Sequence, residues 1–338
     1  MSRKRLDNNL MKVCFLNHDL SDKTGAGRFC LSLVAAIKEI HPNVEYRVIT
    51  HEWVKRIISL RRIFKHYDVV HALDGWPYGF VAVLATRGLG IRVVITAIGT
   101  GAVKPLYQPI KKHLLTWAYR RADAVTAISN NTKREILKVV PGLDIKVINH
   151  GVDFQKFQNT KSKLQMSKPY ILSVGAWKPR KGYKYSIAAF ELVEDKFPDL
   201  KYVIVGNAPE EVKNKYNRIR FLNDLSEEEL VSLYRNAELF VLLPVDDNHD
   251  IEGFGLVFLE AAAAGLAVIG TRESGAEDAV LDGQNGFLVP PRSSEQAAEA
   301  ITKILSDGEL KNRFSEKSRE FAKNMSWAKA AGQYLAIY

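Results

Sequence analysis

Short apolar runs alternate with longer segments of mixed apolar and polar residues along the whole chain. Runs of this kind are typical of buried strands in a parallel sheet. They lie at 11–16, 46–49, 68–72, 93–96, 123–129, 170–175, 201–206, 219–222, 239–243 and 266–269. The segments between them have the length and spacing of helices, so the pattern predicts an α/β chain in which strands and helices alternate.

The stretch 250–270 holds the strongest candidate for a ligand site. A Gly-rich loop at 252–255 precedes a small-residue helix from Leu256 to about Ala264, which Gly265 ends. Glycines let a ligand approach the backbone, and a helix start offers unpaired N–H groups and a positive dipole end to phosphate. We therefore expect a phosphate-bearing ligand here. The alternative is an ordinary turn before a tightly packed helix.

Two acidic residues bracket this loop. Glu252 and Glu260 are eight residues apart, which is about 12 Å at the helical rise of about 1.5 Å per residue. A nucleoside diphosphate sugar has about that length, so one carboxylate would hold the sugar and the other the ribose. Glu260 is stronger evidence for a ligand site than the glycines are, because a charged residue in an apolar helix is rarely buried without a partner.

Composition indicates a globular protein in a reducing compartment. The chain has 338 residues, which suggests two domains, and two cysteines, Cys14 and Cys30, in apolar surroundings. No apolar run is long enough to span a membrane, and the basic N-terminus has no apolar segment typical of a signal peptide. We therefore expect a cytoplasmic protein.

The charge is divided unevenly. Residues 1–165 carry 27 Lys and Arg against 12 Asp and Glu, whereas residues 166–338 carry 21 against 26. The basic front half predicts a negatively charged partner. Segments 53–67 and 103–121 mix basic residues with large apolar ones, which favours docking on an anionic membrane surface. Ordinary core packing with solvated charges is the alternative.

The segment EGFGLVFLEAAAAG closely resembles the E-x7-E motif of family 4 retaining glycosyltransferases of the GT-B fold, and AVIGTRESGAEDAVLDGQNGFLVPP resembles the pattern that follows it. DDNHDIEGFG is similar to the phosphatidylinositol mannosyltransferase branch of that family. The resemblance implies an α/β fold of two Rossmann-like doubly wound domains that face a central cleft. It implies an acceptor-binding domain at 1–160, a nucleotide-sugar-binding domain at 166–322, and a helix at 323–338 that returns to the first domain.

The resemblance also implies roles for individual residues. Glu252 would hold sugar hydroxyls and Glu260 the ribose, while Lys181 neutralises the donor diphosphate. His71, expected at the carboxyl edge of the first sheet, would lie near the reaction; a histidine of the core is the alternative. Together with Lys181 and Glu260, the remaining expected ligand-binding residues are Gly25, Gly27, Gly175, Arg180, Asn207, Leu225, Gly253, Phe254, Gly255, Leu256 and Val257.

Two positions depart from the family pattern. The arginine that follows the glycine of the 175–182 loop is replaced by Ala176, so Arg180 or Lys178 would have to supply the second positive charge. The histidine after the strand at 93–96 is replaced by Ile98, and the backbone of Gly99 and Gly101 would line the acceptor side instead.

We therefore expect a retaining glycosyltransferase that moves a hexosyl group from a GDP- or UDP-linked sugar to a lipid-linked or saccharide acceptor. It would work on the cytoplasmic face of the membrane, without a cofactor or metal ion. The alternative is a non-catalytic nucleotide-sugar-binding protein of the same fold. A sugar-nucleotide epimerase is disfavoured by the E-x7-E spacing, and nucleic-acid binding by the lack of RNA-binding motifs. The loop at 24–28 lacks the third glycine of the NAD fingerprint.

Overall fold

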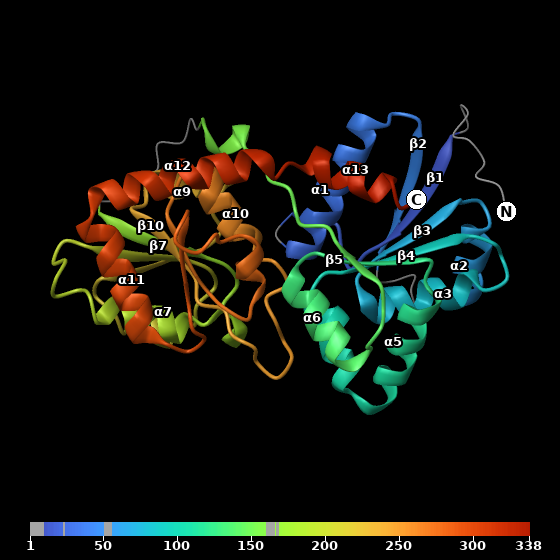
Figure 1. The fold of residues 1–338 in the computed structure, drawn as a ribbon, viewed down its shortest axis with the longest axis horizontal. Coiled ribbons are helices and arrows are strands. Elements are labelled where there is room, and N and C mark those ends of the chain that lie inside the picture. Colours follow the sequence, from blue (N-terminus) through green and yellow to red (C-terminus); the bar gives the residue numbers. More distant parts are fainter. Residues whose placement is uncertain (1–9, 23, 51–55, 160–165, 167–168) are drawn as a thin grey trace. The chain divides into compact units, whose positions relative to one another are not determined.

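A computed structural model describes residues 10–22, 24–50, 56–159, 166 and 169–338. The chain divides into two compact units (Figure 1). The first consists of Met1–Gly151 and Trp327–Tyr338, and the second of Val152–Ser326. The division therefore falls nine residues before the expected end of the first domain at 160, and the returning segment begins at 327 instead of 323.

The first unit is built on a six-stranded parallel sheet in the order β2-β1-β3-β4-β5-β6. The strands are β1 (Met11–Leu16), β2 (Val44–Ile49), β3 (Val69–Leu73), β4 (Arg92–Ala97), β5 (Ala124–Ala127) and β6 (Ile145–Val147). The helices are α1 (Gly25–Ile40), α2 (Ile57–Phe64), α3 (Phe80–Thr86), α4 (Thr100–Val103), α5 (Pro109–Arg121), α6 (Asn130–Val139) and α13 (Trp327–Leu335). The predicted apolar runs of the front half are therefore confirmed as strands.

Helix α1 begins at Gly25, within the stretch 24–28 that was expected to be a loop. Thr24 is its N-cap, and the Thr24 hydroxyl accepts a hydrogen bond of 2.9 Å from the backbone N–H of Gly27. Gly25 and Gly27 consequently lie in the first turn of the helix, not in a loop before it. A Cβ atom at Gly27 would come within 2.0 Å of the Ser21 carbonyl oxygen, so close backbone packing accounts for this glycine.

The last helix, α13, belongs to the first unit and packs beside α1, as Figure 1 shows. Phe29 of α1 contacts Trp327 and Tyr334 of α13, with ring centroids 5.9 and 6.3 Å apart. The ring of His150 lies against Trp327 as well, with ring centroids 5.6 Å apart. Helix α13 therefore groups with the first unit, the unit to which the final helix was expected to return.

The second unit repeats this architecture with the strand order β12-β11-β10-β7-β8-β9. Its strands are β7 (Tyr170–Val174), β8 (Lys201–Val205), β9 (Ile219–Leu222), β10 (Leu239–Val241), β11 (Val268–Thr271) and β12 (Gly286–Val289). Its helices are α7 (Tyr183–Glu191), α8 (Glu210–Lys213), α9 (Glu227–Asn236), α10 (Leu256–Ala263), α11 (Ser294–Ser306) and α12 (Gly308–Asn324). In Figure 1, the sheet lies between α7 and α11 on one side and α9, α10 and α12 on the other.

Part of the linker between the last strand of the first unit, β6, and the first strand of the second unit, β7, packs onto the second unit. The 3₁₀ helix Gln155–Phe157 buries Phe157 against Tyr234, with ring centroids 5.7 Å apart. The side-chain amide of Gln158 donates a hydrogen bond of 2.8 Å to the Ala263 carbonyl oxygen at the end of α10. Positions 160–165 and 167–168 of that linker lie outside the described residues.

Within the described part of the chain, no helix is both long and apolar enough to cross a bilayer.

Candidate functional site

The loop between β10 and α10 is held in place by close backbone contacts. Gly255 precedes the first turn of α10 with a φ of 77°, and a Cβ there would lie 2.7 Å from the Phe258 ring. A Cβ at Gly275 would lie 2.5 Å from the carbonyl of Gly253, and the Gly275 N–H donates to the Glu252 carbonyl oxygen at 3.1 Å. The helix start and the backbone of Glu252 are therefore fixed relative to each other.

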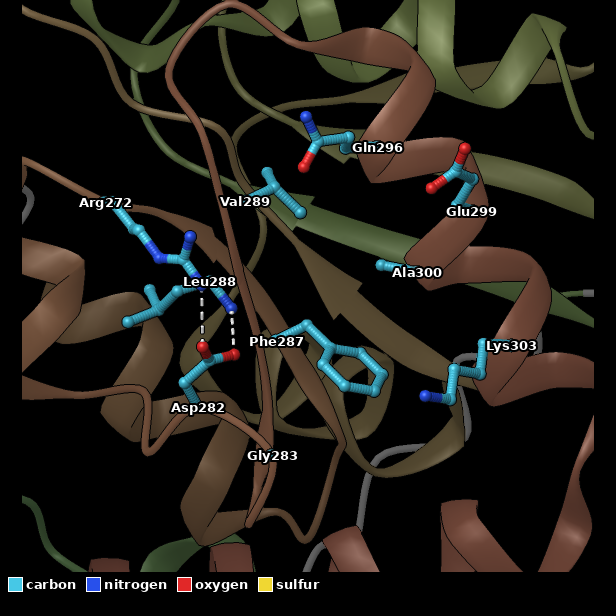
Figure 2. Close-up of a pocket in the computed structure, with 10 residues that line it drawn as sticks. All are labelled: Arg272, Asp282, Gly283, Phe287, Leu288, Val289, Gln296, Glu299, Ala300 and Lys303. Atoms are coloured by element: carbon cyan, nitrogen blue, oxygen red, sulfur yellow. Dashed lines mark hydrogen bonds and ion pairs between the residues drawn. The ribbon is translucent and has the colours of Figure 1, made fainter.

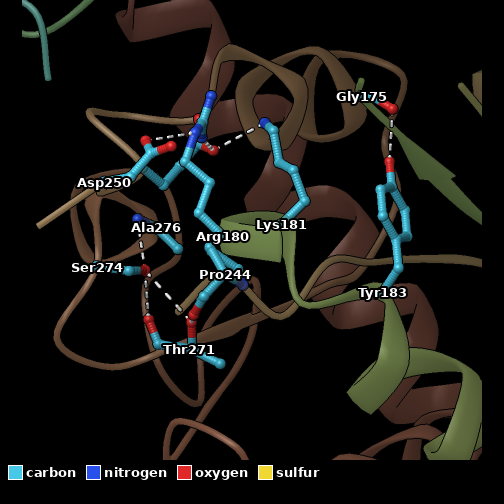
Figure 3. A network of polar contacts seen from close by, with 10 residues as sticks. Gly175, Arg180, Lys181, Tyr183, Pro244, Asp250, Thr271, Ser274 and Ala276 are labelled. Carbon is cyan, nitrogen blue, oxygen red and sulfur yellow. Dashed lines mark hydrogen bonds and ion pairs between the residues drawn. The ribbon is translucent and has the colours of Figure 1, made fainter. Parts of the chain in front are cut away.

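Four charged side chains form one network at this loop. The ammonium of Lys181 lies 2.8 Å from the Glu252 carboxylate, and Arg180 forms an ion pair with the same carboxylate oxygen. The guanidinium of Arg180 also reaches Asp250 at 3.1 Å, as Figure 3 shows. Glu252 and Lys181 are both buried. The network thus holds two positive and two negative charges, of which Lys181 and Glu252 are shielded from bulk water.

The basic side chains keep Glu252 ionised. Burial alone would raise the pKa of this carboxyl, but the charges of Arg180 and Lys181 and their hydrogen bonds bring it down to about 2. The negative charge of Glu252 in turn raises the pKa of Arg180. At neutral pH, Arg180 and Glu252 are therefore charged and paired with each other.

Gly175 gives Lys181 the space it occupies. This glycine has a φ of 152°, and a Cβ there would come within 3.2 Å of the Lys181 Cε. The Tyr183 hydroxyl donates a hydrogen bond of 2.7 Å to the Gly175 carbonyl oxygen (Figure 3), which fixes the loop from the other side. Gly175, Arg180 and Lys181 are thus brought together, as predicted.

The structure places Lys178 and Arg180 differently. Arg180 points to the Glu252 carboxylate, whereas Lys178 is exposed. Ala176, at the position of the missing arginine, is exposed too. Arg180 therefore places a second positive charge at the loop from four residues further along the chain.

Glu260 lies in the second turn of α10 and is buried. Its carboxylate accepts a hydrogen bond of 2.9 Å from the hydroxyl of Tyr234 in α9. The buried acidic side chain thus has a hydroxyl partner inside the protein, which the E-x7-E spacing did not reveal. A contact from Glu260 to a ribose stays a prediction.

Two further predicted residues lie in the loops that follow neighbouring strands. Asn207 follows β8, is exposed, and accepts a hydrogen bond of 3.1 Å from the backbone N–H of Trp177. Leu225 lies after β9 and is half-buried. Since the carboxyl ends of parallel strands share one sheet edge, both lie at the same edge as the Glu252 loop.

The expected position of His71 is wrong. His71 is the third of the five residues of β3 and is fully buried, not at the carboxyl edge of the sheet. Its ring nitrogens lie 2.6 Å from the Tyr338 and Thr96 hydroxyls, and burial lowers the pKa of His71 to about 3. It is therefore a neutral core histidine that joins the end of the chain to the sheet, which is the alternative reading of the sequence.

Asp74 lies at the carboxyl end of β3 and was not among the residues predicted from the sequence. It directly follows β3, and its carboxylate accepts a hydrogen bond of 2.7 Å from the Gly75 N–H. A Cβ at Gly101 would lie 2.0 Å from the Asp74 Oδ2 atom. The glycine at 101 therefore makes room for this carboxylate. The sequence signal was an acidic residue directly after an apolar strand.

We predict that Asp74→Asn flattens the pH dependence of unfolding. Burial raises the pKa of Asp74 to about 7, although hydrogen bonds from the Gly75 and Ile98 backbone lower it. Because this value exceeds the ordinary one of about 3.9, the stability that Asp74 contributes is present at low pH and is lost as pH rises through about 7. Urea titrations at about pH 5 and about pH 8 measure how far the free energy of unfolding falls between the two pH values. This fall should be about 2 kcal/mol smaller in Asp74→Asn than in the wild type. Identical profiles would contradict the assignment.

A pocket of about 390 Å³ lies elsewhere on the second unit (Figure 2). Arg272 is paired with Asp282 at 2.9 Å on one side, and Lys303 lies 5.1 Å from the centre of the Phe287 ring on the other. None of the residues predicted to bind the donor lines it. Among the described residues, no three His, Cys, Asp or Glu side chains are grouped so as to hold a metal ion.

Comparison with known proteins identifies the family. The model of glycosyl transferases group 1 matches residues 154–321, and that of glycosyltransferase family 4 matches residues 24–156. The chain is 29% identical over 306 residues to a D-inositol 3-phosphate glycosyltransferase of Corynebacterium glutamicum, covering 80% of this chain and 72% of the relative. It is 26% identical to an N-acetyl-alpha-D-glucosaminyl L-malate synthase of Bacillus anthracis, covering 81% and 75%.

Among solved structures, Anabaena Alr3699/HepE in complex with UDP-glucose has the same fold, with a TM-score of 0.77. The likeness covers 97% of this chain and all of that one, at 19% identity. The two family models together span most of the chain, one for each half. The chain therefore belongs to the group 1 glycosyltransferases of family 4, and it is a glycosyltransferase with the GT-B fold.

Proposed function

We propose that this glycosyltransferase moves a hexosyl group from a GDP- or UDP-linked sugar to a lipid-linked or saccharide acceptor, with retention of anomeric configuration. The observation that carries the proposal is the buried pairing of Glu252 with Lys181 and Arg180 beside the first turn of α10. This arrangement places two cations, a helix start and a carboxylate within one loop. Those are the groups needed to bind a diphosphate and a sugar together.

Donor binding would exchange partners within the network. The diphosphate would take Lys181, Arg180 and the amides of Gly255, Leu256 and Val257, and the Glu252 carboxylate would turn to sugar hydroxyls. Because charge develops on the departing nucleoside diphosphate, positive groups fixed at that point stabilise the transition state more than the ground state. The leaving phosphate itself would accept the proton of the acceptor hydroxyl, so no strongly basic side chain is required.

The names of similar proteins support a nucleotide-sugar donor and an acceptor that carries a hydroxyl group. The fold neighbour from Anabaena was solved with UDP-glucose, so this fold accommodates a nucleotide sugar. The bacterial relatives are named for inositol 3-phosphate and for malate, which are small polar molecules that carry hydroxyl groups. Nucleotide-sugar transfer to a hydroxyl-bearing acceptor accounts for these names and for the charge network.

A nucleotide-sugar screen tests the proposal. Ligands that bind the folded state raise its melting temperature, so GDP- and UDP-linked hexoses would be compared by thermal shift. Donors that stabilise the protein would then be incubated with saccharide and lipid-linked acceptors, and NMR of the product would report the anomeric configuration. Stabilisation by one donor series and a product with the donor's own configuration are expected. An inverted product, or binding without transfer or donor hydrolysis, would contradict the proposal.

A specific feature of the first unit also favours docking on an anionic membrane. Ile58 of α2 and Ile110 of α5 are 75% and 77% exposed, although both are large and apolar. Both helices pack against α3, and exposed basic residues such as Arg62 and Lys112 lie close to them in the chain. Buried Leu60 and Phe64 show that part of the amphipathic pattern serves the core. The exposed isoleucines and nearby positive charges match the chemistry of an anionic lipid surface.

The double variant Ile58→Ser, Ile110→Ser should lose about tenfold in affinity for anionic vesicles, because each isoleucine contributes buried apolar area at the lipid interface. Flotation with phosphatidylglycerol vesicles at low salt measures this. Leu192→Ser, which removes an exposed leucine from the second unit, serves as the control. No flotation of the wild type, or equal flotation of all three proteins, would rule out membrane docking by this surface.

A further inference from the structure

A second hollow, of about 590 Å³, adjoins the charge network in the second unit. The turn from Lys178 to Tyr183 contributes to both: Lys178, Pro179 and Tyr183 line the hollow, whereas Arg180 and Lys181 pair with Glu252. The volume lies in the range of small-ligand sites, which is about 300–1,000 Å³. We call this hollow the aromatic pocket.

Three aromatic rings line the aromatic pocket, and two of them are held in a fixed stack. The rings of Trp177 and Tyr183 are parallel within 4°, with centroids 4.7 Å apart. The edge of Phe221 supports Trp177 from outside the pocket, at 5.9 Å. The third ring, Tyr185, has the Lys184 ammonium 4.8 Å from its centre. The stacked pair thus offers a preformed apolar wall at little cost in side-chain entropy.

A polar part of the lining belongs to a short hairpin. Asp247 and Asp250 exchange backbone hydrogen bonds of 3.2 and 3.0 Å, and Asn248 and His249 form the turn with φ values of 51° and 64°. Arg292 donates a hydrogen bond of 3.2 Å to the backbone carbonyl of Asp246. The pocket thereby presents a guanidinium next to the side chains of Asp246 and Asp247.

We propose that the aromatic pocket binds a sugar unit of the acceptor away from its reacting hydroxyl, as an uncharged pyranose or a short chain of them. The first unit, expected to bind the acceptor, would hold the reacting end. A sugar ring offers an apolar C–H face that packs on an aromatic ring, and hydroxyls that both donate and accept. Asp246 and Asp247 accept such donors, while Arg292 and Lys178 donate. A free phosphate would meet two carboxylates, and a metal ion would meet the basic groups. The inference rests on the proposed function and names its acceptor class.

The aromatic pocket shares a turn of the backbone with the charge network. Its Lys178–Tyr183 wall is the same turn that carries Arg180 and Lys181, and the Val245 N–H donates a hydrogen bond of 2.9 Å to the Arg180 carbonyl oxygen. A saccharide in the pocket would therefore contact the backbone that positions the donor cations. Loss of the pocket should raise the KM for a saccharide acceptor and leave donor binding unchanged.

The test is titration of the full-length protein with maltose, cellobiose and mannobiose, with binding detected by saturation-transfer NMR. Tyr185→Ala and Asp247→Asn should each lower the affinity for the disaccharide that binds wild type by about tenfold. Tyr185→Ala removes a ring face, and Asp247→Asn removes a charged acceptor of sugar hydroxyls. Tyr216→Ala is the matched control: Tyr216 is also half-buried with a lysine over its ring, 5.4 Å away, and lies outside the pocket. This control should bind the disaccharide as wild type does.

The outcomes separate this inference from the proposed function. Binding of GDP or UDP is measured in the same variants and should not change, because none of the three residues belongs to the donor network. Disaccharide binding that is equal in wild type, Tyr185→Ala and Asp247→Asn would overturn the pocket assignment, even with donor binding intact. No binding of any of the three disaccharides at about 10 mM would overturn it too. Failure of the wild type to bind any nucleotide would instead contradict the proposed function.

Discussion

Lys181→Met should lower kcat/KM for glycosyl transfer by about 10²–10³-fold, the usual effect of removing one preorganised charge that stabilises a leaving group. Lys181 is buried beside the first turn of α10, and its ammonium lies 2.8 Å from Glu252. Methionine keeps most of the side-chain volume and removes only the charge. Affinity for the nucleoside diphosphate should fall by about tenfold or more. Radiolabelled donor assays and calorimetric titration measure the two effects.

A matched control separates this loss from a general effect on charge. Lys317→Met removes a lysine that pairs with Glu320 at 2.7 Å in α12, on the surface of the same unit. Its transfer rate should equal that of the wild type. The melting temperature of Lys181→Met should stay close to that of the wild type, because Glu252 keeps Arg180 as its partner. A folded Lys181→Met variant with full activity would refute the role of this lysine.

Glu252→Gln should act in opposite directions on transfer and on nucleotide binding. Glutamine loses the charged contact to the sugar hydroxyls, so transfer should fall by about 10²-fold or more. The same change frees Lys181 and Arg180 from a competing carboxylate, so the nucleoside diphosphate without its sugar should bind several-fold more tightly. Titration with GDP and UDP, together with the transfer assay, checks both directions.

The control for this variant is Glu238→Gln, which weakens a partly buried ion pair of 2.6 Å with Lys311. It should change neither transfer nor nucleotide affinity. Weaker nucleotide binding in Glu252→Gln would show that the carboxylate supports the loop more than it competes with phosphate. Because the pKa of Glu252 is about 2, these effects should persist down to about pH 4.

The repeated strands and the loop at 252–255 could be predicted because their signals are local. Apolar runs between helical segments define a parallel sheet, and glycine before a small-residue helix defines a tight turn. The start of α10 at Leu256 and the φ of 77° at Gly255 agree with that analysis. The resemblance of the E-x7-E segment to family 4 identified the family and the fold.

What the sequence could not supply are contacts between distant parts of the chain. His71 is placed in the core by Tyr338, which lies 267 residues away, and no local pattern reports such a pair. Arg180 pairs with Glu252 across 72 residues, so this contact could be found only in the folded loop. The hydroxyl partner of Glu260, Tyr234, lies on another helix for the same reason.

The start of α1 was misplaced through competing local signals. Glycines at 25 and 27 resemble a loop, because glycine disfavours a helix interior by about 1 kcal/mol. The Thr24 cap and the close approach of the Ser21 carbonyl to Gly27 outweigh that preference. Tertiary packing therefore decided the helix boundary against residue propensity.

A crystal structure of the protein with its bound nucleotide sugar tests the central claim most directly. The account predicts diphosphate oxygens about 3 Å from the Lys181 ammonium and from the amides that open α10, with the Glu252 carboxylate turned to the sugar hydroxyls. A complex in which the Lys181–Glu252 pair stays closed and the diphosphate binds elsewhere would contradict it.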